Sequence, residues 1–161
     1  SIERRVADRE NLYAGTVDLI GEVEGRKGII DIKTSIELQD QYALQTAAYL
    51  QAYNREGAQS LFSDIQYDQC VTKWILRIDQ YRECIGCLAK MRDKTGRATI
   101  RDGKKDCNHQ WTEVKGEVEF VELPDQKEDL RAFLAAKEVW EWYNKRWLKQ
   151  IKNYPRNNIY S

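Results

Sequence analysis

Residues 12–34 read LYAGTVDLIGEVEGRKGIIDIKT, and this stretch decides the fold class. Both of its ends, residues 12–20 and 28–34, are rich in β-branched and other apolar residues, whereas residues 24–27 are polar and contain glycine. Two apolar runs joined by a short polar segment predict an antiparallel hairpin. We therefore expect a β-sheet that starts with these two strands.

Alternation along the second strand separates its charged side chains from its apolar ones. Successive side chains of a strand point to opposite faces, so Ile30 and Ile32 share one face while Asp31 and Lys33 share the other. Asp18 on the first strand alternates with apolar neighbours in the same way. We expect each strand to bury its apolar face and to expose its charges.

Further strands and two helices follow along the chain. We predict a helix over residues 39–56 that ends at Gly57, strands over residues 71–79 and 117–123, and a helix that follows Pro124 and stops near Pro155. This order predicts one α/β (α+β) domain over residues 1–161, with a mixed central sheet flanked by helices. A polar, cysteine-containing insertion occupies residues 80–116.

The last helix carries a capping signal and a group of aromatic residues. Asp125 and Glu128 have the spacing of a capping box at the start of the helix. The aromatic residues are Trp140, Trp142, Tyr143 and Trp147. We expect them to pack in the core rather than to stack on bases, and we expect Cys70 to be a core residue.

Composition excludes two classes of protein. The 161 residues hold 26 Lys+Arg and 26 Asp+Glu, so the chain is not a strongly basic nucleic-acid-binding domain, and any nucleic acid must be held by a local patch or through cations. No apolar run approaches the roughly 20 residues of a membrane span. The charged start of the chain lacks a secretory signal, so a cytoplasmic protein without membrane partners is expected.

Asp31-Ile32-Lys33 is one of four acid-x-Lys matches, where about two are expected by chance from 26 acids and 13 lysines. The others begin at Asp102, Glu113 and Asp125. Only the match at Asp31 lies in an apolar strand, after a strand with an acid and before a helix. Carboxylates can hold Mg²⁺ or Mn²⁺ beside a phosphodiester, and a lysine can position water or stabilise developing negative charge. The alternative is an ordinary solvated strand face.

Three segments together resemble the PD-(D/E)XK nuclease superfamily, in its RecB-like and phage-exonuclease-like branch. The matching segments are Gly15-Thr16-Val17-Asp18, Asp31-Ile32-Lys33-Thr34-Ser35 and Gln45-Thr46-Ala47-Ala48-Tyr49. The resemblance is close over residues 1–53. It implies a restriction-endonuclease-like core, with Asp18 and Asp31 as metal ligands and Lys33 as the catalytic lysine. Independently of the resemblance, the carbonyl of Ile32, between the acid and the lysine, can complete the coordination shell of the cation.

The same resemblance assigns roles to three more residues. Gln45 and Tyr49 match the active-site helix pair that orients the lysine and the DNA, although an ordinary amphipathic helix would show the same spacing. Glu3 matches a third metal-binding acid on a preceding helix, or is simply an acid near a helix N-terminus. Family members usually carry further helical sequence before this acid, so we expect a truncated or minimal version.

Cysteine spacing in the insertion predicts a small zinc ribbon. Cys84 and Cys87 are separated by two residues, and Cys107 and His109 follow with one residue between them. Two such pairs supply the four ligands of tetrahedral zinc, although the second spacing is shorter than usual. Reduced thiols without metal, an iron–sulfur cluster or a redox pair are the alternatives.

The insertion also concentrates positive charge. Its basic residues are Lys90, Arg92, Lys94, Arg97, Arg101, Lys104 and Lys105. We predict that they contact the DNA backbone, the alternative being a merely soluble loop.

Two functional hypotheses fit these patterns. The first is a Mg²⁺- or Mn²⁺-dependent deoxyribonuclease with a structural zinc ion, an exonuclease of phage or prophage recombination or of DNA repair in a bacterial or phage-infected cell. DNA is its partner, with other recombination proteins or further copies of the chain as candidates. The second hypothesis keeps the fold but treats the chain as a catalytically incomplete nucleic-acid-binding or assembly module.

Overall fold

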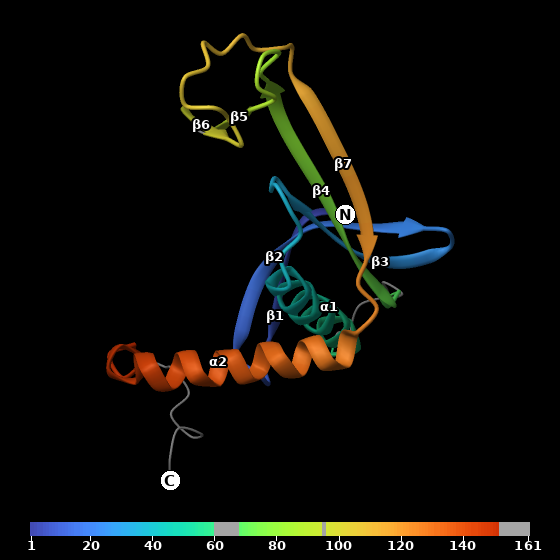
Figure 1. The fold of residues 1–161 in the computed structure, drawn as a ribbon. Helices are drawn as coiled ribbons and strands as arrows, with labels where there is room; N and C mark the ends of the chain where they lie inside the picture. The colour runs from blue at the N-terminus through green and yellow to red at the C-terminus, as the bar shows by residue number, and fades with distance from the viewer. Residues whose placement is uncertain (60–67, 95, 152–161) are drawn as a thin grey trace.

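The computed structural model describes residues 1–59, 68–94 and 96–151. In chain order the elements are β1 (Ile2–Asp8), β2 (Tyr13–Val23), β3 (Arg26–Lys33), α1 (Gln41–Gln59), β4 (Thr72–Glu83), β5 (Lys90–Lys94), β6 (Arg97–Arg101), β7 (Lys115–Glu122) and α2 (Gln126–Leu148). The predicted fold class is confirmed, because a mixed seven-stranded sheet is accompanied by two helices (Figure 1). Across the described residues, neither helix combines the length and the apolar character needed to span a bilayer.

The sheet is antiparallel except at one pair of strands. β1, β2 and β3 follow one another as antiparallel neighbours, β4 lies parallel to β3, and β7 pairs antiparallel with β4. A parallel pair needs a crossover connection, and α1 lies in the one between β3 and β4. The predicted β2–β3 hairpin is confirmed, and Glu24 and Gly25 form its turn with positive φ angles of 51° and 74°.

Helix α1 covers one face of the sheet and closes the core. The main cluster of buried side chains consists of Val6, Val17, Ile20, Ile29, Leu50, Ala52, Tyr53 and Cys70, as expected for Cys70. Ala47, Ala48 and Ala52 are almost fully buried, so small residues let α1 approach the strands closely. The helix continues through Gly57, contrary to the prediction, because one glycine costs a helix only about 1 kcal/mol.

Helix α1 also covers the face of β3 that was expected to be exposed, while Ile30 on the other face is buried as expected. Asp31, with 2% of its surface exposed, shares the covered face with Ile29, whereas Ile32 on the opposite face is 42% exposed. The expectation that β3 exposes its charges is therefore wrong for Asp31. Regular alternation also fails in β2, since Val17 and Ile20 belong to the same buried cluster although they lie three positions apart.

Helix α2 lies against α1 and reaches the same sheet face. The Gln126 side chain donates a hydrogen bond to the Ala47 carbonyl at 3.0 Å, and the Phe133 ring meets the Tyr13 ring edge-on at 5.0 Å. Asp129 pairs with the fully buried Lys73 of β4 at 2.5 Å. Packing and a buried ion pair thus fix the first half of α2.

Two expectations for α2 need correction, and a third lies outside the described residues. Its predicted capping box is absent, because the Asp125 side chain makes no capping hydrogen bond. The helix ends at Leu148, and the predicted stop near Pro155 lies outside the described residues. The four aromatic residues expected in the core are exposed, from 53% for Trp142 to 80% for Tyr143. They lie beyond the half of the helix that contacts α1 and the sheet.

The long pair β4–β7 forms an arm that carries the insertion. β4 pairs with β3 only up to Arg77 but with β7 up to Tyr81, so the two strands continue away from the helices together (Figure 1). β5 pairs with the end of β4 and with β6, which gives a hairpin at the end of the arm. Neither this hairpin nor strand β1 was predicted from the sequence.

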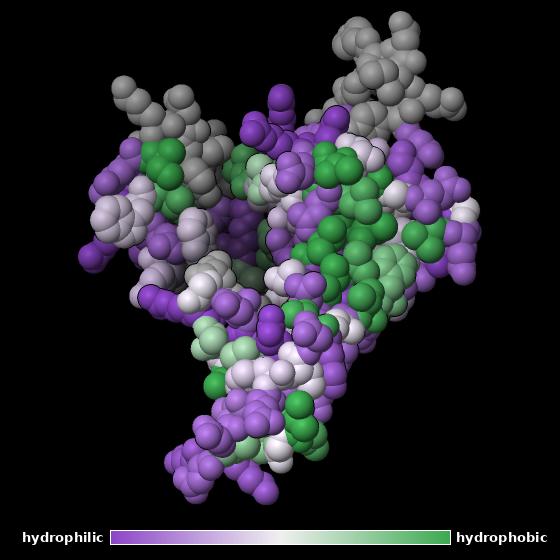
Figure 2. All heavy atoms as spheres, turned by 90° about the horizontal axis from the view of Figure 1, so that it is seen from above, coloured by the Kyte–Doolittle hydropathy of each residue, from purple (hydrophilic) through white to green (hydrophobic). Residues whose placement is uncertain are grey.

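The molecular surface is uneven in polarity. Seen from above, it has a hollow in which hydrophilic residues gather, and hydrophobic residues form a patch beside it (Figure 2). The sheet face away from α1 contributes exposed apolar side chains such as Phe120, which stacks on Trp74 with ring centroids 5.9 Å apart.

Gly28→Ala is expected to destabilise the fold, because the Trp74 ring lies directly on Gly28. A Cβ at residue 28 would lie 2.2 Å from Trp74 Cζ3 and 2.6 Å from the Thr72 carbonyl oxygen. We expect the free energy of unfolding, measured with urea, to fall by about 1–3 kcal/mol. Gly21 pairs with Gly28, and a Cβ there would meet only Ile30 at 3.5 Å. Gly21→Ala should therefore leave the stability unchanged or slightly raised, and equal losses would contradict the explanation.

Candidate functional site

Four side chains form a connected chain where β3 ends beside α1. Lys33 Nζ lies 2.7 Å from Asp31 Oδ2 and donates a hydrogen bond to Gln45 Oε1 at 2.9 Å. The Gln45 amide in turn donates to the Tyr49 hydroxyl at 2.8 Å. The structure therefore brings together four of the residues predicted from the sequence. Tyr42, which was not among the predicted residues, places its ring centroid 4.9 Å from Lys33 Nζ.

The absence of a side chain at Gly15 of β2 makes room for these four connected side chains. Gln45 and Tyr49 lie one turn apart on the same face of α1, and the Tyr49 ring rests against Gly15. A Cβ at residue 15 would lie 2.2 Å from Tyr49 Cε1. Glycine at this position of the Gly-Thr-Val-Asp segment thus has a direct role, since it lets Tyr49 reach Gln45.

Asp18 lies close to Asp31 and shapes its electrostatics. Oδ2 of Asp18 accepts a hydrogen bond from the Ile32 amide at 2.8 Å, across the two strands. Burial raises the pKa of the Asp31 carboxyl, the Lys33 ammonium lowers it, and the Asp18 charge raises it again, with a net upward direction. Two carboxylates therefore lie near one another, and the surroundings of Asp31 disfavour its negative charge.

Asp31 retains an oxygen that could bind a cation. Its Oδ2 is buried and lies 2.7 Å from the Lys33 ammonium, so a cation bound at this oxygen would share it with Lys33. Carboxylate oxygens are the donors that Mg²⁺ and Mn²⁺ prefer. Asp31 and Asp18 thus fit a hard divalent cation.

Glu3 differs from the expectation. It lies on strand β1 with φ at 49°, not on a helix. The pairs Ile2–Leu19 and Arg4–Val17 flank it, so Glu3 lies opposite Asp18 in the register. Within the described residues, no group of three carboxylates that includes it has donor atoms within 4.8 Å of one another. The proposed metal roles of Glu3 and of the Ile32 carbonyl stay predictions.

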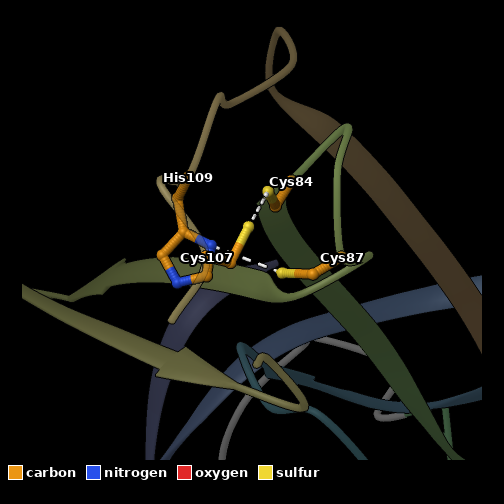
Figure 3. A group of neighbouring side chains, drawn as sticks. All are labelled: Cys84, Cys87, Cys107 and His109. Carbon is orange, nitrogen blue, oxygen red and sulfur yellow. Dashed lines mark hydrogen bonds between the residues drawn. The ribbon is translucent and has the colours of Figure 1, made fainter. Parts of the chain in front are cut away.

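A second group of chemically active side chains lies at the end of the arm. The donor atoms of Cys84, Cys87, Cys107 and His109 all lie within 4.8 Å of one another (Figure 3). Cys84 Sγ is 3.7 Å from Cys107 Sγ, and Cys87 Sγ is 3.4 Å from His109 Nδ1. Three thiols and an imidazole form a common tetrahedral zinc ligand set. This cluster can therefore bind a metal such as zinc.

Tight backbone turns hold the four ligands together. The Leu88 amide donates to the Cys84 carbonyl at 2.9 Å, and Leu88 adopts a positive φ of 61° to close this turn. Cys84 also pairs with Trp111 as an isolated β-bridge, and the Trp111 ring packs 4.9 Å from the His109 ring. These contacts bring the segment before β7 back to the end of β4.

The thiols of Cys84 and Cys107 differ in how readily they ionise. Burial raises the pKa of Cys84, but hydrogen bonds from His109 and nearby amides outweigh it and lower the value to about 6. The hydrogen bond with Cys87, together with burial and the other thiols, raises the pKa of Cys107 to about 11. A metal ion would neutralise the charge of the crowded thiolates.

The basic residues of the insertion divide into different environments. Arg92 is buried and donates two hydrogen bonds to Asp79, at 2.8 and 2.7 Å, so the prediction that it contacts DNA is wrong because its charge is already used. Lys90 lies 3.4 Å from Glu117. Of the other predicted residues, Arg97, Arg101, Lys104 and Lys105 are exposed, and the Lys94 side chain lies outside the described part of the chain.

Arg77, which was not predicted from the sequence, connects the site to β7. Its side chain donates to the carbonyls of Ser35 and Ile36 at 3.2 and 2.9 Å and to Glu119 at 2.7 Å. Arg77 lies opposite Lys33 in the register. The sequence does contain a signal for this role. Lys73, Arg77 and Asp79 lie on one face of a predicted strand, and charged residues in a strand that is otherwise apolar are typical of buried ion pairs.

Asp31→Asn and Asp79→Asn are expected to change stability in opposite directions. The pKa of Asp31 is raised in the folded protein, so the contribution of Asp31 to the free energy of unfolding falls as pH rises above about 4, the pKa of an unfolded aspartate. At pH 7 Asp31→Asn should therefore melt at a temperature equal to or higher than that of the wild type. Arg92 lowers the pKa of Asp79, whose contribution is present above about pH 4 and is lost on acidification. Asp79→Asn should cost about 3 kcal/mol at pH 7.

Thermal melts of both variants between pH 3 and pH 8, without added divalent metal, check this prediction. A loss for Asp31→Asn as large as that for Asp79→Asn would show that the Asp31 charge stabilises the fold rather than serving the site.

Comparison with known proteins does not assign a family. No protein-family model matches the chain, and no curated protein matches its sequence. The function of the chain must therefore be inferred from the geometry of the two sites.

Proposed function

We propose that the chain is a metal-dependent deoxyribonuclease that hydrolyses DNA phosphodiester bonds at Asp31 and Lys33. The observation that supports it best is the continuous row of side-chain contacts from Asp31 through Lys33 and Gln45 to Tyr49. A purely structural ion pair has no need of a glutamine and a tyrosine that fix the lysine amine. The sequence resemblance to PD-(D/E)XK nucleases supports the same assignment.

Each residue has a distinct task in this proposal. Asp18 and Asp31 would hold a Mg²⁺ or Mn²⁺ ion, which when bound would supply charge to polarise the phosphate and to lower the pKa of a water. Lys33 lies beside Asp31, where its ammonium orients that water or stabilises the charge that develops on the phosphate oxygens. Gln45 fixes the direction of the Lys33 amine, and Tyr49 fixes Gln45.

The biological setting is proposed from the resemblance alone. An exonuclease of phage or prophage recombination, or of DNA repair, would act in the cytoplasm of a bacterial or phage-infected cell. Recombination proteins or further copies of the chain are its candidate partners besides DNA. A reducing cytoplasm would also keep the four cysteines as thiols.

The second metal in this proposal is a structural zinc ion at the Cys/His cluster. Few apolar side chains of the insertion are buried, so burial alone gives it little stability. Zinc held by Cys84, Cys87, Cys107 and His109 would fix the base of the β5–β6 hairpin.

One observation favours the alternative of a catalytically incomplete binding module. Asp18 already accepts the Ile32 amide, and Glu3 does not join Asp18 and Asp31 in one group of ligands. A site with this arrangement could bind nucleic acid without cleaving it. Cleavage assays separate the two functions directly.

Cleavage of end-labelled DNA tests the nuclease. In Mg²⁺ or Mn²⁺ the wild type should degrade linear DNA, and Asp31→Asn and Lys33→Ala should each lower the rate by about 100-fold or more, because each removes a group that acts on the reacting phosphate. Cutting of linear but not circular DNA would identify an exonuclease. Single-stranded and double-stranded substrates should be compared in the same assay.

A matched control comes from another acid-x-Lys sequence. Asp125 and Lys127 have the same spacing but lie at the start of α2, so Asp125→Asn and Lys127→Ala should cleave at the wild-type rate. Absence of cleavage by the wild type, with DNA binding retained, would replace the nuclease by the binding module.

Elemental analysis tests the zinc site. Protein purified anaerobically without chelators should contain one zinc ion per chain, and Cys84→Ser should lose it because a thiolate ligand is removed. Cys70→Ala should keep the zinc, since Cys70 lies in the main core and not in the cluster. Metal-free wild type, or a full zinc content in Cys84→Ser, would exclude the assignment.

A further inference from the structure

A small hollow lies between the candidate active site and the β5–β6 hairpin. Its volume is about 150 Å³, and it is lined by Ile36, Arg92, Thr99 and Arg101. Ile36 belongs to the segment that follows β3, whereas the other three residues belong to the hairpin. The hairpin therefore lies next to the segment that leaves Lys33.

The wall formed by Ile36 is fixed close to Lys33. Ile36 follows Lys33 by three residues, which limits the separation of their Cα atoms to about 11 Å. Arg77 donates to the carbonyls of Ser35 and Ile36 and is itself paired with Glu119. The hollow thus keeps a defined position relative to the lysine.

Positive charge in the hollow is only partly neutralised. Arg92 is paired with Asp79 through two hydrogen bonds. Arg101 is exposed and, among the described residues, takes part in no ion pair shown by the structure. It lies opposite Lys90 across the hairpin, and the Lys90 ammonium is paired with Glu117. The Arg101 charge is therefore the one in the hollow that a bound anion would neutralise.

The size and lining of the hollow fit one kind of anion. At about 150 Å³ it is smaller than the roughly 300 Å³ at which drug-sized ligand pockets begin. Apart from the paired Arg92, its polar lining residues are Arg101 and Thr99, and guanidinium and hydroxyl groups are donors typical of phosphate contacts in protein–DNA complexes. A phosphate group therefore fits better than a base or a nucleoside.

We propose that this hollow is a phosphate subsite in which Arg101 and Thr99 bind the backbone phosphate next to the one at Lys33. The subsite rests on the proposed nuclease function and adds the position of the DNA strand, which runs from the β3 end toward β6. It also distinguishes Arg101 from the other exposed basic residues of the insertion, which contribute only general attraction.

Salt-dependent DNA binding tests the subsite without relying on cleavage. Binding of a fluorescein-labelled oligonucleotide is measured in an Asp31→Asn background, without added divalent metal, over a range of NaCl concentrations. Arg101→Gln should weaken binding about tenfold and reduce the slope of log K against log salt by about 0.7 for single-stranded or 0.9 for double-stranded DNA.

The matched control is Arg97→Gln, which removes the same charge from the other end of β6, outside the hollow. It should weaken binding less than threefold. Equal effects of the two variants, or an unchanged affinity in Arg101→Gln, would overturn the subsite and leave only diffuse attraction. Equal thermal melts of both variants and their parent would confirm that the fold is retained.

A cleavage assay separates failure of the subsite from failure of the nuclease. If the otherwise wild-type chain cleaves DNA, Arg101→Gln should raise KM and leave kcat within about twofold, because the residue lies away from the reacting phosphate. If the chain does not cleave, a selective loss of binding in Arg101→Gln still supports the subsite while the nuclease is rejected.

Discussion

The carboxylate of Asp31 is buried beneath α1, and the arrangement of the candidate site depends on how that charge is tolerated. Lys33 supplies the opposite charge from the same strand face, and Gln45 and Tyr49 extend the contact onto the helix. Since Tyr49 reaches Gln45 only because Gly15 has no side chain, three elements meet around one carboxylate. The raised pKa shows that this compensation is incomplete. A buried charge that lowers the stability of the fold is typical of functional sites and is unusual for groups selected only for stability.

Strand β4 connects the candidate site to the last helix, to β7 and to the insertion through ion pairs. Lys73, Arg77 and Asp79 lie on its covered face, and each pairs with a different part of the chain. Lys73 reaches α2, Arg77 reaches β7 and the segment after β3, and Asp79 reaches the insertion through Arg92. Charged residues in a strand interior are tolerated when each is paired. This strand is therefore the common support of the site, the last helix and the hairpin.

Local sequence patterns predicted much of the fold, and long-range packing explains the rest. The β2–β3 hairpin, α1, β4 and β7 were predictable because they are runs rich in apolar residues separated by polar segments, and the proximity of four candidate site residues followed from their order along the chain. The buried face of β3 was not predictable, because alternation shows which side chains share a face but not which face a helix covers. The pairing of Arg92 with Asp79 is likewise invisible in a charge count. Strand β1 was missed since its charged residues lack alternation, and the exposed aromatic residues of α2 show that helical spacing alone does not establish burial.

The Cys/His cluster at the end of the arm also has a consequence for chain entropy. The ladder between β4 and β7 ends at Tyr81 and Lys115, so roughly thirty residues must be looped out before these strands can pair, about fifteen times as many as in a two-residue hairpin. Loop-closure entropy makes this about 2 kcal/mol less favourable than a short turn. The four ligands lie at the base of the loop, two after β4 and two before β7. A single bound ion would therefore hold the ends of the two strands together, as a short turn does in an ordinary hairpin. The order of assembly would then depend on metal, with β7 joining the sheet only after the ion has closed the loop.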